Sequence, residues 1–192
     1  SPNMLIRRVD MNEEVYQDKD EFNQDIIVAY QKAIQAFYDA GCRYLQLDDT
    51  AWADLFSEEG HNKLRAKGLD PAEELKLMQY VINESIAKKP EDLVVTMHIC
   101  RGNYKSNYFT SGGYDFASEA IFGGLNVNGL FLEFDDERSG SFEPLKYVNR
   151  KDLKIVLGLI TTKTGTLEDK EKIIARIQEA ATYVPLEQLC LS

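Results

Sequence analysis

The sequence predicts an α/β fold of the (β/α)8 TIM barrel type, present as a partial barrel of about five strands in one domain, residues 1–192. Helical and strand patterns alternate along the chain, which predicts βαβ units and a parallel sheet. Polar residues gather where the strands end, the edge at which barrels and doubly wound sheets bind ligands. No Gly-rich phosphate loop follows a strand, which favours the barrel over a dinucleotide-binding sheet. Because a complete barrel typically takes about 250 residues, 192 residues predict only part of one.

In the first half of the chain, apolar residues at helical spacing predict a helix over about residues 19–40 that ends at Gly41. Residues 42–49, CRYLQLDD, form a short predicted strand ending in acids. A polar segment with a short helix follows. Asp70 and Pro71 then have the residue types of an N-cap and a first helical position, which predicts a helix from Pro71 to about Lys89.

In the second half, β-branched residues predict a strand over 92–100, followed by a long polar loop and a helix near 114–122. The later strands are expected at 128–136, 154–163 and 187–192. The last helix is expected at 166–183, before the final strand. These elements complete the predicted set of four full strands and the start of a fifth.

Composition excludes several classes of partner. The formal net charge of −10 and the isoelectric point near 4.8 argue against nucleic acid and against anionic membrane surfaces. No apolar run approaches the roughly 20 residues that span a bilayer. The chain has three cysteines that are far apart, Cys42, Cys100 and Cys190, so we expect no disulfide framework. We therefore expect the protein to reside in the reducing cytoplasm. Cys42 follows a helix-ending glycine and is expected to pack in the core.

His98 and Cys100 are two residues apart in a predicted strand, so their side chains share one face. Imidazole and thiolate are ligands that zinc prefers, but two ligands do not complete a site. Taken alone, the pair favours the plainer alternative of a buried cysteine and a hydrogen-bonded histidine.

Glu133 shifts this balance towards a metal. It interrupts the apolar run GLFLEFDD, where a carboxylate facing a barrel interior needs a counter-charge or a metal. The alternatives are that Glu133 faces an exposed side or pairs with an arginine such as Arg101.

Other polar and aromatic residues leave two interpretations open. Asp48 and Asp49 end the strand QLDD, where one of them could bind a substrate amine or both could simply lead into a helix. His61 lies in a polar segment and is expected to be solvated. Four aromatic residues are expected either to line the mouth of the barrel or to pack: Trp52, Tyr104, Tyr108 and Tyr114.

Four segments of the chain, HICRGN, FLEFDDERSGSFEPL, VLGLITTKTGTLED and VPLEQLCLS, closely resemble the cobalamin-independent methionine synthase family, especially its short single-barrel members. The resemblance runs from about Gly41 to the last residue. It implies that residues 1–192 are the C-terminal part of a single (β/α)8 barrel with zinc at its C-terminal mouth. It also implies a methyltransferase that forms methionine by methylating the thiol of homocysteine, with 5-methyltetrahydropteroyltriglutamate as the expected donor.

The resemblance also implies roles for particular residues. His98 and Cys100 match the family's H-x-C zinc ligands, and Glu133 matches the glutamate ligand on the next strand. Asp48 matches the catalytic-site aspartate of the family's Q-[IL]-D-E-P segment, which binds the amino group of homocysteine. Asp49 and Thr50 replace the glutamate and the proline of that segment.

Two departures from the family pattern leave alternatives open. The last zinc ligand of the family is a cysteine in a P-x-C-G segment beyond the final LS, so Cys190 is not expected to replace it. The family's D-I-H histidine, a proton donor, is replaced in LITTKTG by Thr161 or Lys163, which puts folate as the donor in doubt. The alternatives are a related zinc–thiol alkyl transferase with methylcobalamin or another donor, and a non-catalytic truncated barrel whose open strand edges invite self-association.

Overall fold

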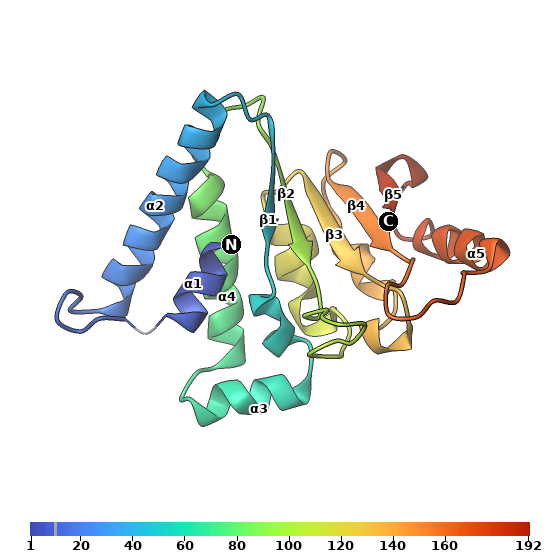
Figure 1. The fold of residues 1–192 in the computed structure, drawn as a ribbon, viewed down its shortest axis with the longest axis horizontal. Helices are drawn as coiled ribbons and strands as arrows, with labels where there is room; N and C mark the ends of the chain where they lie inside the picture. Colours follow the sequence, from blue (N-terminus) through green and yellow to red (C-terminus); the bar gives the residue numbers. More distant parts are fainter. Residues whose placement is uncertain (10) are drawn as a thin grey trace.

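The computed structural model describes residues 1–9 and 11–192 of the chain. It confirms the predicted parallel sheet, in which five strands lie side by side in chain order. The strands are parallel and therefore end at the same edge of the sheet, where the chain turns into loops (Figure 1). The strands are β1 (Tyr44–Asp48), β2 (Val94–Ile99), β3 (Gly129–Glu133), β4 (Lys154–Gly158) and β5 (Leu189–Leu191).

The helices begin at side chains suited to capping. Asp18, Asp70 and Asp169 each accept hydrogen bonds from backbone N–H groups in the first turn of the helix that follows. The α-helices are α1 (Pro2–Arg8), α2 (Lys19–Asp39), α3 (Glu58–Ala66), α4 (Pro71–Ile86) and α5 (Lys170–Ala180). The shorter turns are η1 (Ala51–Leu55), η2 (Asp115–Ala117), η3 (Glu119–Gly123), η4 (Glu137–Ser139), η5 (Glu143–Tyr147) and η6 (Leu186–Gln188).

The two faces of the sheet have different surroundings. Alternate strand residues such as Leu47, Met97 and Leu132 join one hydrophobic core with side chains from α2 and α4. The other face carries Gln46 and Asp48 of β1, which are exposed. Figure 1 shows α1, α2 and α4 grouped beside β1, while α5 lies beside β5. The core therefore sits on one side of the sheet, and the opposite face leads to the polar edge.

Some predicted elements differ in detail from the observed ones. The segment 114–122, predicted as one helix, forms the separate turns η2 and η3. The strand predicted over 154–163 ends at Gly158, where a Cβ atom would meet the carbonyl oxygen of Leu132 at 2.5 Å. The last helix starts at Lys170 rather than Thr166, because Asp169 supplies the cap.

β1 and β5 form the two edges of the sheet in the described part of the chain. Self-association through these edges stays a prediction. None of the helices formed by residues 1–9 and 11–192 has the length and apolar character needed to cross a membrane.

Candidate metal centre

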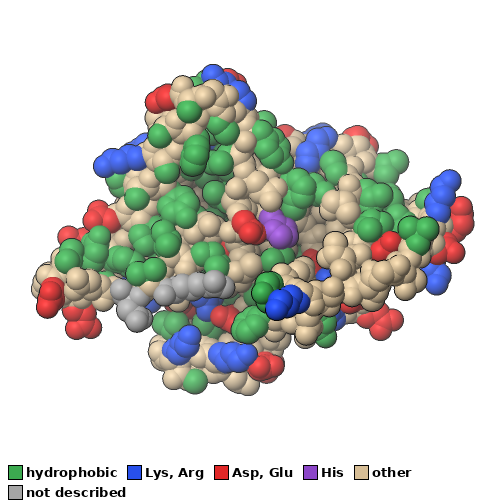
Figure 2. All heavy atoms as spheres, in the orientation of Figure 1, with side chains coloured by type: hydrophobic (Ala, Val, Ile, Leu, Met, Phe, Trp, Pro, Cys, Tyr) green, Lys and Arg blue, Asp and Glu red, His purple; other side chains and the backbone are tan. Residues whose placement is uncertain are grey.

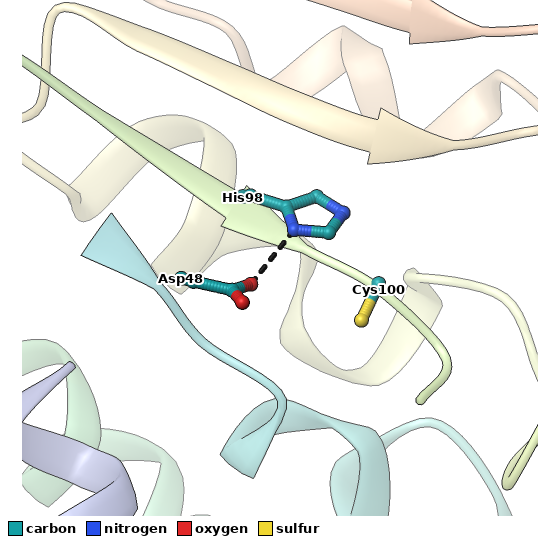
Figure 3. Close-up of side chains that lie close together, drawn as sticks. All are labelled: Asp48, His98 and Cys100. Atoms are coloured by element: carbon teal, nitrogen blue, oxygen red, sulfur yellow. Dashed lines mark hydrogen bonds and ion pairs between the residues drawn. The ribbon is translucent and has the colours of Figure 1, made fainter. Parts of the chain in front are cut away.

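The register of the first two strands brings Asp48 and His98 together. The two residues are direct partners in the parallel β1–β2 pair. His98 Nδ1 lies 2.7 Å from Asp48 Oδ1 (Figure 3). A carboxylate oxygen accepts hydrogen bonds, so we assign the ring proton to Nδ1, which leaves Nε2 with a lone pair for a ligand. The space-filling view shows a histidine exposed beside an acidic side chain in the middle of the visible face (Figure 2).

Cys100 follows β2 directly and is buried, with 6% of its surface exposed. The N–H of Gly102 donates a hydrogen bond of 3.3 Å to the Cys100 sulfur. Gly102 has φ of +75°, and a Cβ atom there would lie 2.8 Å from Cβ of Phe109, so this turn requires glycine. Burial raises the pKa of the Cys100 thiol, and the nearby carboxylates of Asp48 and Glu133 raise it further.

Asp48, His98 and Cys100 together form a candidate metal centre. Each offers one ligand atom, and these atoms all lie within 4.8 Å of one another (Figure 3). Imidazole, thiolate and carboxylate are the donors that zinc takes in proteins, so this donor set fits zinc. The sequence predicts His98 and Cys100 as ligands, and the structure brings them to one place. It puts Asp48, predicted as a substrate-binding residue, in the same cluster.

The carboxylate of Glu133 lies at the end of β3, one strand further along, and is buried. Its Oε2 accepts hydrogen bonds of 3.0 Å from the backbone N–H of Arg101 and from Nδ2 of Asn103. Its Oε1 accepts from the Arg138 guanidinium and, at 3.0 Å, from Lys163 Nζ. Glu133 therefore contacts the loop after Cys100 through one oxygen and two cations through the other.

These two cations also share Asp135. Lys163 Nζ lies 2.7 Å from one oxygen of Asp135, and Arg138 Nη2 lies 3.0 Å from the other. Burial by itself would raise the pKa of Glu133, but the hydrogen bonds from Arg138 and Lys163 outweigh it and lower this pKa to about 2. The sequence pointed to an arginine such as Arg101 as the alternative partner of Glu133. In the structure the guanidinium partner is Arg138, and Arg101 contributes its backbone N–H.

Tyr114 and Arg101 support Glu133 from the core. The Tyr114 hydroxyl accepts a 2.9 Å hydrogen bond from the Glu133 N–H and lies 3.3 Å from the Glu133 carbonyl oxygen. The Arg101 guanidinium is fully buried, 4.1 Å from the centre of the Phe56 ring and 4.3 Å from that of Tyr114. Sequence reasoning missed Arg138 and this use of Tyr114. The acids at Asp135 and Asp136 were the signal that a nearby cation would be needed.

The ionisation of Glu133 makes a testable contribution to stability. Because its pKa falls from an ordinary 4.5 to about 2 on folding, it stabilises the native protein above pH 4.5. That contribution is lost as the pH falls from 4.5 to 2. We expect Glu133→Gln to flatten the decline of the free energy of unfolding across this window, as measured by urea unfolding of the metal-free protein at each pH. Identical slopes in the wild type and the variant would contradict this.

The remaining predicted site residues are mostly structural. The prediction that His61 is solvated is wrong: its Nε2 lies 3.1 Å from the carbonyl oxygen of Leu55, and its ring packs on Phe116. Asp49 is buried and accepts a hydrogen bond from the Trp52 indole, so both belong to the core. The other four residues take the following positions: Tyr108 stacks on Arg138, Tyr104 is exposed, Cys42 packs at the margin of the core, and Cys190 is exposed in β5.

A parallel α/β sheet with imidazole, thiol and carboxylate groups at the carboxyl ends of its strands is typical of a metal-dependent barrel protein. The chain belongs to the family described as cobalamin-independent synthase, catalytic domain, whose family model matches residues 7–192. This membership confirms the expected family.

Two relatives match all or most of the chain. The uncharacterized protein YxjG of Bacillus subtilis (strain 168) is 56% identical over 193 residues, covering 100% of this chain and 51% of its own length. The methionine synthase of Pyrococcus horikoshii is 25% identical over 93% of this chain and 44% of its own length.

A solved structure is similar over the whole chain. It is the putative vitamin-B12 independent methionine synthase from Listeria monocytogenes, with 52% identity and a TM-score of 0.82, covering 100% of this chain and 54% of that one. The chain thus spans about half the length of the relatives it matches.

Proposed function

We propose that this protein is a zinc-dependent methyltransferase that transfers a methyl group to the thiol of homocysteine to form methionine. The observation that carries the proposal is the cluster at the polar edge of the sheet, where potential ligand atoms of His98 and Cys100 lie within 4.8 Å of each other and of an Asp48 oxygen. The family of the chain and its similarity to the methionine synthase of Pyrococcus horikoshii support the same reaction. Because the chain spans about half the length of its relatives, we propose this activity for the whole protein and not for residues 1–192 alone.

His98 and Cys100 would hold the zinc, with Glu133 as the third ligand that the family resemblance implies. A bound zinc ion holds a coordinated thiol deprotonated at neutral pH, which makes the substrate sulfur a nucleophile. The hydrogen bond from His98 Nδ1 to Asp48 fixes the orientation of the imidazole ring, as outer-shell carboxylates do for metal-binding histidines.

Asp48 also suits recognition of the amino acid. One of its oxygens binds His98, while its side chain remains 70% exposed, so the other oxygen can accept a hydrogen bond from the ammonium group of homocysteine. A pocket of about 330 Å³ beside His98 is lined by two acids, Glu133 and Asp135, and by Lys163, which pairs with both of them. Both pocket acids are already paired with cations, so the free oxygen of Asp48 is the group that would receive the ammonium of the substrate.

We propose the cytoplasm as the setting of the reaction. Ligation requires Cys100 as a thiol, and Cys100 is a free cysteine in the structure. A reducing compartment keeps such a thiol available.

The methyl donor decides between the two enzymatic alternatives. We propose 5-methyltetrahydropteroyltriglutamate as the donor. In the segment where the family has a histidine, Lys163 is ion-paired with Glu133 and Asp135, and this departure keeps methylcobalamin as the competing donor. The test is to incubate the full-length protein with zinc, homocysteine and each donor separately, and to measure methionine. Turnover with methylcobalamin alone would replace the folate proposal. Zinc-loaded protein without turnover of either donor would favour a non-catalytic role.

A further inference from the structure

The hydrogen-bonding capacity of the Glu133 carboxylate is already filled. An ionised carboxylate has about four lone-pair positions for donors. Glu133 uses two at Oε2, for Arg101 N–H and Asn103, and two at Oε1, for Arg138 and Lys163. A metal needs one of these lone pairs. If Glu133 binds the zinc of the proposed function, one of its four donors has to withdraw.

Two of the four donors, the Arg101 N–H and the Arg138 guanidinium, are held in place by the chain or by other bonds. A third, the amide of Asn103, is exposed and neutral, so it does not repel a metal cation as the two cationic donors do. The donor from Arg101 is a backbone N–H immediately after Cys100, so it moves only with the metal-binding segment itself. The Arg138 guanidinium also bonds Asp135 and Asp136, and it stacks at 4.1 Å over the ring of Tyr108. Its planar fork matches these acids together, so releasing one bond disturbs the others.

Lys163 differs from Arg138 in having a flexible stem and a better alternative partner. Its Nζ lies 2.7 Å from Asp135 Oδ2 and 3.0 Å from Glu133 Oε1. An ammonium group can rotate on its four-carbon stem and keep one acceptor while it gives up another. Asp135 is nearly fully buried, with 3% of its side chain exposed, and so remains beside Lys163 as its counter-charge.

We propose that Lys163 is the donor that Glu133 releases when it binds the metal, and that Asp135 retains the ammonium group at that moment. This inference rests on the proposed function, in which Glu133 is a zinc ligand. Lys163 and Asp135 are then positioning residues that set the affinity of the site through Glu133. Lys163 competes with the metal for Glu133, and Asp135 weakens that competition.

The inference predicts changes of zinc affinity in opposite directions. Lys163→Met removes the competitor, so zinc should bind about tenfold more tightly, within the range known for outer-shell residues of metal sites. Asp135→Asn leaves Lys163 more dependent on Glu133, so zinc should bind about tenfold more weakly. Affinities are measured on the full-length protein by competition with a chromogenic chelator. Lys163→Arg keeps the charge but offers Glu133 and Asp135 a planar fork that releases one acceptor less easily, so zinc should bind more weakly than to the wild type.

Glu133→Gln separates this mechanism from simple charge repulsion. In the Glu133→Gln background, Lys163→Met should change zinc affinity by less than about twofold, because the competition has been removed. An equal gain in both backgrounds would mean that Lys163 acts only as a nearby charge and would overturn the inference. Lys88→Met, which removes an exposed lysine before the start of β2, is the matched control and should leave the affinity unchanged.

The failures of the two proposals are distinguishable. If the wild-type protein binds no zinc, the proposed function fails, and this inference fails with it. If the wild type binds zinc but Lys163→Met binds it more weakly, only the inference is overturned, since Lys163 would then hold Glu133 in place for the metal. Thermal unfolding of each metal-free variant establishes that a loss of affinity does not come from a loss of folding.

Discussion

Under the proposed function, replacing Cys100 by serine should abolish zinc binding and methyl transfer. Cys100 is the one sulfur ligand in the cluster with Asp48 and His98, and serine is a poor ligand for zinc at neutral pH. Outer-shell changes typically cost 10–100-fold in metal affinity, so loss of this ligand should cost more than about 100-fold. Zinc content by atomic absorption after dialysis, together with methionine formation, measures both effects.

The matched control for this prediction is Cys190→Ser. Cys190 is also a free cysteine, but it is exposed in β5 and lies outside the cluster. This variant should keep zinc and activity at wild-type levels. If Cys100→Ser retained zinc as well as Cys190→Ser does, the proposed centre would be wrong.

Of the substitutions proposed here, replacing Trp52 by alanine should cause the largest loss in the free energy of unfolding. Trp52 is fully buried in η1, the turn after β1, and its Nε1 donates a 3.1 Å hydrogen bond to the buried carboxylate of Asp49. Removing a buried tryptophan typically costs about 3–5 kcal/mol in cavity and transfer terms. Because a domain is stable by only about 5–15 kcal/mol, we expect the variant to be largely unfolded at moderate urea concentrations.

Trp52→Phe separates packing from hydrogen bonding. Phenylalanine fills most of the space but leaves Asp49 with Asn3 and the Ala51 N–H as its remaining donors. We expect it to cost about 1–3 kcal/mol, less than the alanine variant. Trp52 is the single tryptophan of the chain, so unfolding is followed by circular dichroism rather than by fluorescence. A loss below about 1 kcal/mol for Trp52→Ala would contradict the packing argument.

Local sequence patterns were enough to predict most of the elements of this fold. Alternating helices and strands and the acids at strand ends predicted the parallel sheet, and the structure confirms it. Asp70 and Pro71 marked the start of α4 because capping and the fixed φ of proline are local effects. The sequence predicted one helix over 114–122, whereas the structure has two separate turns there. This segment starts at Tyr114, whose hydroxyl accepts a hydrogen bond from the distant Glu133 N–H, a contact that local patterns do not contain.

The candidate metal centre was only partly visible in the sequence. The two-residue spacing placed His98 and Cys100 on one face, because the side-chain period of a strand is two. Parallel pairing then set Asp48 opposite His98, a relation between residues 50 positions apart that the spacing alone does not contain. His61 shows the opposite case: a polar segment predicted exposure, but packing on Phe116 buried it.

Residue order and residue chemistry were sufficient to predict the order of the helices and strands, the polar residues at the strand ends and the residue types for a zinc site. These follow from periodicity, capping and residue chemistry, which act over a few positions. The surroundings of Glu133, by contrast, depend on how distant segments pack together. Its four donors come from the loop after Cys100, from Arg138 and from Lys163, and they meet because neighbouring parallel strands end at the same edge. Long-range contacts of this kind depend on register and burial, and so the competition for Glu133 became visible only in three dimensions.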